Sequence, residues 1–339
     1  MQFLLYILAF VGYNEVMELE RPGIKMRYLN ELRDGEMLKE TYLCKQTQTL
    51  KTKNGKSYYS LILQDKTGTI DAKVWELGPA IEHFDAMDYI HIEAQVTNFQ
   101  GTLQLNVKRI RKSQEGEYNP ADFMPTTTKN VEEMYKELLT YVNKIKEPHM
   151  RALVNSFFVE DKKFIDKFKK HSAAKSVHHG FMGGLLEHTL GITRLCDYLA
   201  DNYPMLQRDL LLASAMFHDI GKLEEISSFP ENDYTDEGNL LGHIYIGTQW
   251  IHDRIKNIPG FPSKMANEIM HCILAHHGEL EYGSPKKPAI AEALALSLAD
   301  NLDAKLQTMT ELLNSSEDKS DWLGYQRLFE SNVRKTSVY

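Results

Sequence analysis

The stretch ASAMFHDIGKL, Ala213 to Leu223, decides which fold we expect for this chain of 339 residues. An apolar helical run ends there in His218 and Asp219, and Gly221 and Lys222 follow. An imidazole and a carboxylate side by side at a helix end can bind one divalent cation. Gly221 is expected to adopt the left-handed conformation that ends a helix, and Lys222 to offer a positive charge to a phosphate. By itself the pair is equally compatible with a capped helix end.

Other segments place His or Asp among apolar residues in the same way. They are His188 in GGLLEHTL, His243 in LLGHIYIG, His276 and His277 in ILAHHGEL, and Asp300 in LSLADNLDA. A buried polar side chain without a partner costs free energy, so each of these residues requires a partner. A shared metal centre would supply one to all of them. Asp303, about one helical turn after Asp300, is expected to orient a ligand.

The order H…HD…H…HH…D resembles that of the HD-domain metal-dependent phosphohydrolases, whose two-metal members carry extra histidines before the final Asp. The resemblance implies that a first metal is held by His188, His218, Asp219 and Asp300. It implies that a second metal is held by His243 and His276, with His277 as an additional or alternative ligand.

Between Gly35 and Lys112 the pattern changes, because apolar and polar residues alternate there as in β-strands. Turn signals at Asn54-Gly55, Asp65 to Gly68 and Gln100-Gly101 separate the alternating segments. With a first strand around Met37 to Thr47, the pattern predicts five short strands, which is typical of an OB barrel.

OB barrels bind single-stranded nucleic acid by stacking bases on exposed aromatic side chains beside a basic groove. The candidates for such contacts here are Tyr58, Trp75, Phe99 and Lys73. Aromatic residues on strands are more often packing residues than base platforms, so packing is the alternative for each of them.

Two further segments are candidates for substrate contacts. His178 and His179 precede a glycine-rich bend, Gly180 to Gly184, and we favour substrate contacts over metal ligation for them; capping is a further alternative. Lys286 and Lys287 lie in a loop between prolines, close in sequence to two expected ligands. A rigid basic loop there suits contacts to a nucleic-acid backbone.

Composition is that of an ordinary soluble protein, with 42% hydrophobic and 25% charged residues. The three cysteines, Cys44, Cys196 and Cys272, show no CxxC spacing. This argues against a disulfide framework or zinc ribbon and favours a reducing, cytoplasmic location. The net charge is −8, although residues 24–112 carry 14 Lys and Arg against 11 Asp and Glu. A mildly basic module joined to an acidic one is compatible with a nuclease but is no evidence for it.

The expected fold class is α+β multidomain, a five-stranded OB-like β-barrel followed by an all-α HD domain. Residues 24–112 form the OB domain, 113–130 a linker, 131–325 the HD domain and 326–339 a C-terminal tail. Residues 1–23 are an extension whose apolar run, Phe3 to Val11, is too short to span a bilayer, so no membrane association is expected. Two explanations of this extension are open. Either translation truly starts nearer Met17 or Met26, so that Met1 is an upstream start codon, or the apolar run is a strand or helix that docks on the rest of the protein. The first explanation is favoured.

A barrel followed by an HD domain resembles the YhaM-type 3′-to-5′ exoribonucleases of Gram-positive bacteria. The stretches SLILQDKTGTIDAKVW, HHGFMGGLLEHTL, FHDIGKLEE, YTDEGNLLGHIYIG, AHHGELEYGSPKKP and ADNLDAK carry the resemblance. It implies a manganese-stimulated enzyme that releases nucleoside 5′-monophosphates from single-stranded RNA, with single-stranded DNA as a further substrate. Asp219 would bridge two cations that activate water, and Lys222 would neutralise a phosphate oxygen.

Several alternatives stay open. The mixed nitrogen and oxygen ligand set suits Mn²⁺, Co²⁺, Fe²⁺ or Zn²⁺ better than Mg²⁺. One rival function is hydrolysis of a small nucleotide or cyclic dinucleotide, with the barrel regulatory or oligomerising. The other is a single-stranded nucleic-acid-binding protein with a structural metal centre. A homo-oligomer is compatible with each of these functions.

Overall fold

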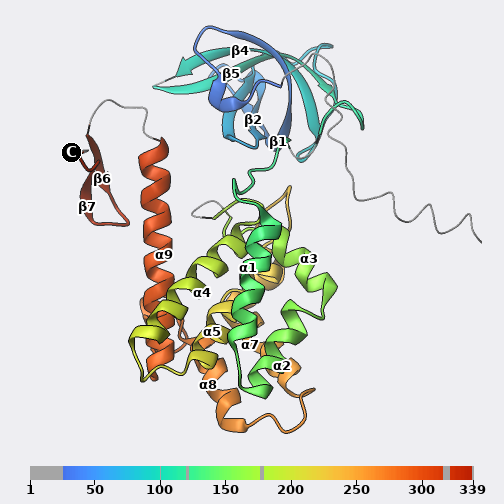
Figure 1. Ribbon diagram of the computed structural model, residues 1–339. Helices are drawn as coiled ribbons and strands as arrows, with labels where there is room; N and C mark the ends of the chain where they lie inside the picture. Colours follow the sequence, from blue (N-terminus) through green and yellow to red (C-terminus); the bar gives the residue numbers. More distant parts are fainter. Residues whose placement is uncertain (1–25, 100, 120–121, 176–178, 316–320, 338–339) are drawn as a thin grey trace, which may run out of the picture.

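The computed structural model describes residues 26–99, 101–119, 122–175, 179–315 and 321–337. A β-barrel lies above a helical domain, and the long helix α9 runs along one side (Figure 1). The expected fold class is therefore confirmed. The extension 1–23 with its apolar run lies outside the described residues. Within those residues, no helix combines the length and the apolar character that a bilayer crossing requires.

Alternating apolar residues build the barrel, as the sequence pattern predicts. Strand β4, for example, buries Ile90, Ile92, Ala94 and Val96 and turns the residues between them outward. The strands close in the order β1-β2-β3-β5-β4, with β3 and β5 parallel and the other pairs antiparallel. They are β1 (Met37–Lys51), β2 (Ser57–Asp65), β3 (Gly68–Val74), β4 (Tyr89–Phe99) and β5 (Thr102–Lys112).

The helical domain is organised around α5 (Arg208–Phe217), in which every residue from Leu210 to Phe217 is buried. Phe217 packs edge to face against Phe157, and this contact fixes the end of α5 where His218 follows. The other helices are α1 (Val131–Lys144), α2 (Pro148–Phe158), α3 (Lys162–Lys170), α4 (Gly184–Asn202), α6 (Lys222–Glu225), α7 (Asp236–Ile255), α8 (Ser263–Leu274) and α9 (Ala291–Ser315).

The segment between the two domains packs against both. On the barrel side, the Gln64 side chain donates a hydrogen bond to the Phe123 carbonyl at 3.0 Å, and Phe123 is buried. On the helical side, Thr126 forms an isolated bridge with Met182. The expected linker is therefore attached to both domains, through Phe123 on one side and Thr126 on the other.

Gly221 does not have the conformation that we expected. Its φ and ψ of −65° and −18° are right-handed, so the expected left-handed helix stop is wrong. A Cβ at this position would lie 2.1 Å from the carbonyl oxygen of His243 and 2.7 Å from the amide nitrogen of Gly247. Glycine is needed there because the turn after α5 touches the backbone of α7.

The last described residues form a hairpin, although residues 326–339 were expected to be a C-terminal tail. Strands β6 (Trp322–Gln326) and β7 (Ser331–Arg334) pair antiparallel, so the expected boundary between residues 325 and 326 falls within β6. The hairpin turns back alongside α9 (Figure 1).

Candidate metal centre

Five elements bring the expected ligands to one place. His188 lies in the second turn of α4, and His218 and Asp219 follow the last residue of α5. His243 follows Gly242, where a positive φ of 72° kinks α7. His276 and His277 come directly after α8, and Asp300 lies in the middle of α9.

The first group of ligand atoms consists of His188, His218 and Asp300, which lie within 4.8 Å of one another. The Nε2 atoms of His188 and His218 face each other at 3.2 Å. Asp219 adds its Oδ2, which lies 3.4 Å from His188 Nε2 and 3.2 Å from His218 Nε2. Two nitrogens and two carboxylates converging in this way can hold one divalent cation.

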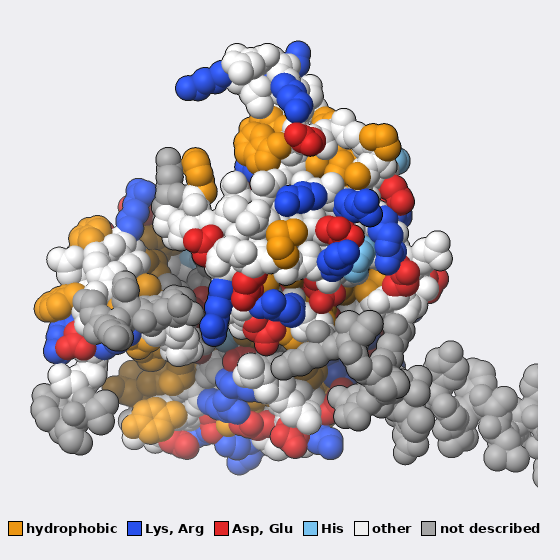
Figure 2. All heavy atoms as spheres, turned by 90° about the horizontal axis from the view of Figure 1, so that it is seen from above, with side chains coloured by type: hydrophobic (Ala, Val, Ile, Leu, Met, Phe, Trp, Pro, Cys, Tyr) orange, Lys and Arg blue, Asp and Glu red, His pale blue; other side chains and the backbone are white. Residues whose placement is uncertain are grey.

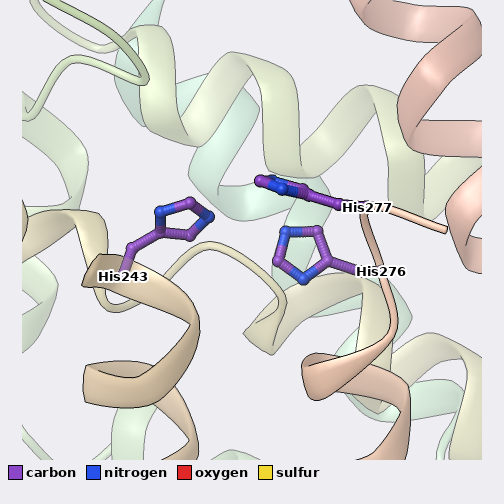
Figure 3. A group of neighbouring side chains, drawn as sticks. All are labelled: His243, His276 and His277. Carbon is purple, nitrogen blue, oxygen red and sulfur yellow. The ribbon is translucent and has the colours of Figure 1, made fainter. Parts of the chain in front are cut away.

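The second group consists of His243, His276 and His277, whose ligand atoms also lie within 4.8 Å of one another. Figure 3 shows the three rings converging from α7 and from the loop after α8. The other oxygen of Asp219, Oδ1, lies 3.5 Å from His243 Nε2 and 3.7 Å from His276 Nε2. One carboxylate thus presents a different oxygen to each group.

Hydrogen bonds fix the orientation of each ring. His218 and His276 donate from Nδ1 to the carbonyls of Ala215 and Ile273, at 2.8 and 2.7 Å. His277 donates from Nδ1 to the carbonyl of Tyr282 at 2.9 Å. Because Nδ1 carries the proton in each ring, Nε2 keeps its lone pair for a cation.

Carboxylates orient the other two rings. His188 donates from Nδ1 to Asp303 Oδ2 at 2.8 Å, which is the contact expected for Asp303. His243 donates from Nδ1 to Glu225 Oε1 at 2.9 Å. Nothing in the local sequence around Glu225 indicated this role, because the contact depends on how α6 packs against α7.

Three buried atoms at the centre have no hydrogen-bond partner among the described residues. They are Asp219 Oδ1, His243 Nε2 and His276 Nε2. Buried polar atoms in proteins are almost always paired, and an unpaired one costs about 1–3 kcal/mol. Three of them facing one another fit a bound cation, which would pair with all three.

The electrostatics of the centre also fit a cation. Burial, with His277 and His218 nearby, holds the pKa of His276 well below its usual range, so its ring is neutral and can bind metal. Burial raises the pKa of the Asp219 carboxyl, but Lys222 and His218 outweigh it and hold this pKa well below its usual range. Asp219 is therefore an anion at neutral pH.

Lys222 lies at the edge of this centre. Its Nζ is 2.7 Å from Asp219 Oδ2, and its side chain lines the same pocket, of about 360 Å³, as His188 and His276. Burial opposes the charge of Lys222, yet the Asp219 carboxylate outweighs it and raises the pKa of Lys222. A cationic ammonium therefore lies beside the carboxylate that faces both groups of ligand atoms.

None of the described histidine and lysine side chains expected to contact substrate beside the glycine-rich bend and in the basic loop lines the pocket. His178 lies outside the described residues. His179 is buried, and its Nε2 lies 3.3 Å from Asp303 Oδ2, so it contacts the group that orients His188 and does not line the pocket. Lys287 pairs with Glu279 at 2.5 Å on the surface, and neither Lys286 nor Lys287 lines the pocket. The geometry therefore favours a positioning role for His179.

The barrel candidates also differ among themselves. Trp75 is 41% exposed and stacks on Tyr58 with the ring centroids 4.6 Å apart, and Phe99 is 60% exposed. Lys73 is held by Ser60 Oγ and Asp71 Oδ1, each at 2.7 Å. The aromatic side chains are thus accessible for stacking, whereas the ammonium of Lys73 is already paired. Basic and acidic side chains are interspersed on this end of the molecule (Figure 2).

The fold and the site define a class of protein, the HD-type metal-dependent phosphohydrolases, here joined to an OB-type barrel. The HD domain family matches residues 185–305, and the family described as OB-fold nucleic acid binding domain matches residues 45–112. Within this class the chain belongs to the YhaM family of 3′-5′ exoribonucleases, as the sequence resemblance predicted.

The similarity to relatives named 3′-5′ exoribonuclease YhaM extends over most of the chain. The Geobacillus sp. (strain WCH70) protein is 36% identical over 262 residues, 77% of this chain and 80% of the relative. The Listeria welshimeri protein is 33% identical over 285 residues, 84% and 90% of the two chains. Among solved structures, the second OB-fold domain of Methanococcus maripaludis replication protein A covers 28% of this chain and 100% of its own, at 18% identity. Its TM-score of 0.22 establishes no shared fold.

Proposed function

We propose that this protein is a metal-dependent 3′-to-5′ exoribonuclease that shortens single-stranded RNA to nucleoside 5′-monophosphates at a two-metal centre. One observation carries the proposal: the two oxygens of Asp219 face two separate groups of histidines. A carboxylate placed between two ligand sets is what a two-metal phosphodiesterase requires. The names of the relatives supply the direction of degradation and the substrate class.

Each residue of the centre has a role in this proposal. His188, His218 and Asp300 hold one cation, and His243, His276 and His277 hold the other, with Asp219 between them. Mn²⁺ is the first candidate for both sites, and Co²⁺, Fe²⁺ and Zn²⁺ are the alternatives. When bound there, such ions would supply Lewis acidity and lower the pKa of water toward neutral pH. Lys222 leaves its contact with Asp219 to pair with the phosphate as negative charge increases.

The barrel holds the single strand in this proposal. The exposed rings of Trp75 and Phe99 can stack on bases. Because every base has an aromatic face, we expect the barrel to bind single strands with little sequence preference. The bases of single-stranded DNA can stack in the same way, and we propose single-stranded DNA as a second substrate. A cytoplasmic location and a homo-oligomeric state stay predictions. Light scattering tests the oligomeric state, because it gives the mass in solution for comparison with the chain mass of 39.1 kDa.

The direct test is a manganese titration with RNA labelled at its 5′ end. We expect a ladder of products that shortens from the 3′ end, appears with added Mn²⁺ and disappears with a chelator. A single internal cut, or equal degradation in chelator, would contradict the proposal. Faster hydrolysis of a cyclic dinucleotide than of RNA would favour the small-nucleotide alternative.

Replacing Glu225 with alanine is expected to weaken manganese binding by about 10- to 100-fold, the usual effect of removing a carboxylate that orients a ligating histidine. The reason is that His243 would lose the acceptor that holds its ring. Calorimetric titration with Mn²⁺ measures the change. The matched control is Glu224→Ala, since Glu224 pairs with Lys167 on the surface. Equal affinities in the two variants would contradict the assignment.

Replacing Trp75 with alanine is expected to weaken binding of single-stranded RNA by about 5- to 150-fold, because stacking of one base contributes about 1–3 kcal/mol. Fluorescence anisotropy with a labelled oligonucleotide in chelator measures binding without hydrolysis. Tyr203→Ala is the control, since Tyr203 is comparably exposed but lies on the helical domain. An unchanged dissociation constant for Trp75→Ala would exclude this residue as a base platform.

A further inference from the structure

Part of the pocket lining comes from α9 and from the C-terminal hairpin. Ser297, Asn301 and Lys305 line it from α9, where a spacing of four residues places them along one helix face. Leu328, in the turn between β6 and β7, and Tyr282 complete this wall. Tyr282, α9 and Leu328 thus meet beside the metal centre. The match to the HD domain family ends at residue 305, before Leu328.

The polar side chains of this wall have unused bonding capacity. Among the described residues, Ser297, Asn301 and Lys305 have no hydrogen-bond or ion-pair partner for their side chains, and the Tyr282 hydroxyl has none. Their neighbours on the same helix differ, because Asp300 and Asp303 are engaged by His188. The wall therefore presents an amide, two hydroxyls and an ammonium to whatever fills the pocket.

The hairpin adds an apolar surface to these polar groups. Leu328 is 54% exposed although it lines the pocket, so one face of its side chain is open to a ligand. A recess separates the hairpin from the barrel when the molecule is seen from the barrel end (Figure 2).

We propose that these residues form the subsite for the terminal nucleotide of the strand, the one that is released; this inference rests on the proposed function. Lys305 pairs with a phosphate, Asn301 and Ser297 hydrogen-bond the sugar hydroxyls, and Leu328 and Tyr282 pack against the base. A pocket of about 360 Å³ suits one nucleotide. The ligand class is a nucleoside 5′-monophosphate, recognised through phosphate, sugar and base together.

Kinetics on a 5′-labelled RNA oligonucleotide give the first test. Lys305→Ala and Asn301→Ala are each expected to raise KM by about 10-fold, the effect of losing one charged or bidentate contact of about 1.4 kcal/mol. Hydrolysis of bis(p-nitrophenyl) phosphate, which has no sugar or base, should be impaired less in Asn301→Ala than hydrolysis of RNA. Lys264→Ala, an exposed lysine on α8, is the control. Equal losses on both substrates, or none on RNA, would overturn the subsite.

Calorimetry separates the subsite from the exonuclease activity. The Mn²⁺-loaded protein is titrated with adenosine 5′-monophosphate and with ribose 5-phosphate. We expect tighter binding of the nucleotide in the wild type, and a preference reduced by about 10-fold in Leu328→Ala, which deletes the apolar contact to the base. An unchanged preference would overturn the assignment of Leu328. If the nucleotide binds as expected but RNA is not shortened from its 3′ end, the proposed function fails and the subsite stands.

Discussion

Replacing Asp219 with alanine is expected to abolish hydrolysis of RNA, with a fall in kcat of about 1,000-fold or more, while binding to the barrel is kept. Asp219 is the residue whose two oxygens face both groups of ligands, so its loss affects both cations. Each factor of ten corresponds to about 1.4 kcal/mol, and a metal centre supplies several kcal/mol of stabilisation to the transition state. Multiple-turnover assays with 5′-labelled RNA at saturating concentration measure kcat, and anisotropy measures binding.

Two comparisons keep this prediction interpretable. Truncation leaves Lys222, whose side chain is largely buried, without its partner carboxylate, so the alanine variant can lose stability for reasons unrelated to catalysis. Asp219→Asn keeps the volume and tests the charge alone, and Asp253→Ala removes an exposed carboxylate that pairs with Lys256. We expect both Asp219 variants to be inactive and the Asp253 variant to be fully active. Manganese-dependent ladder formation by a folded Asp219→Asn variant would refute the role of the carboxylate.

The convergence of the candidate ligands could be predicted because several of them break a local rule of sequence patterning. His188, His276 and Asp300 interrupt apolar helical runs, and the structure brings them together with His218 and Asp219. Polar side chains on buried helix faces need polar or metal partners. The sequence therefore indicates which side chains need a partner, but it does not indicate where that partner lies. The strands were predictable for the related reason that their alternation has a period of two residues.

The residues that could not be predicted act through contacts between elements distant in sequence. Glu225 reaches His243 only because α6 packs against α7, and Asn301 and Lys305 resemble ordinary surface residues of a long helix. His179 appeared suited to substrate contact, yet the fold places it against Asp303. The local sequence pattern does not indicate which helices or strands pack against one another. The roles of these residues depend on that packing, so they could not be predicted.

Gly221 leads to the second large effect, since Gly221→Ala is expected to lower the free energy of unfolding by about 3 kcal/mol or more. A Cβ there would lie 2.1 Å from the carbonyl oxygen of His243, and a backbone atom cannot move aside as a flexible side chain can. To make room, α7 must shift away from the turn that carries Asp219. The shift would carry His243 away from Asp219 Oδ1, now 3.5 Å from its Nε2, so manganese affinity should fall together with stability.

Two other glycines supply a graded comparison for this prediction. Gly78→Ala meets nothing within 4 Å and should leave stability nearly unchanged. Gly247→Ala lies on the other side of the same contact, where its Cβ would be 3.3 Å from the Gly221 amide nitrogen. That contact is tight but tolerable, and alanine gains about 1 kcal/mol of helix propensity over glycine, so the two effects should nearly cancel. Urea denaturation of the three variants measures the order. If Gly221→Ala were as stable as Gly78→Ala, the close approach of the turn to α7 would not be what requires a glycine at this position.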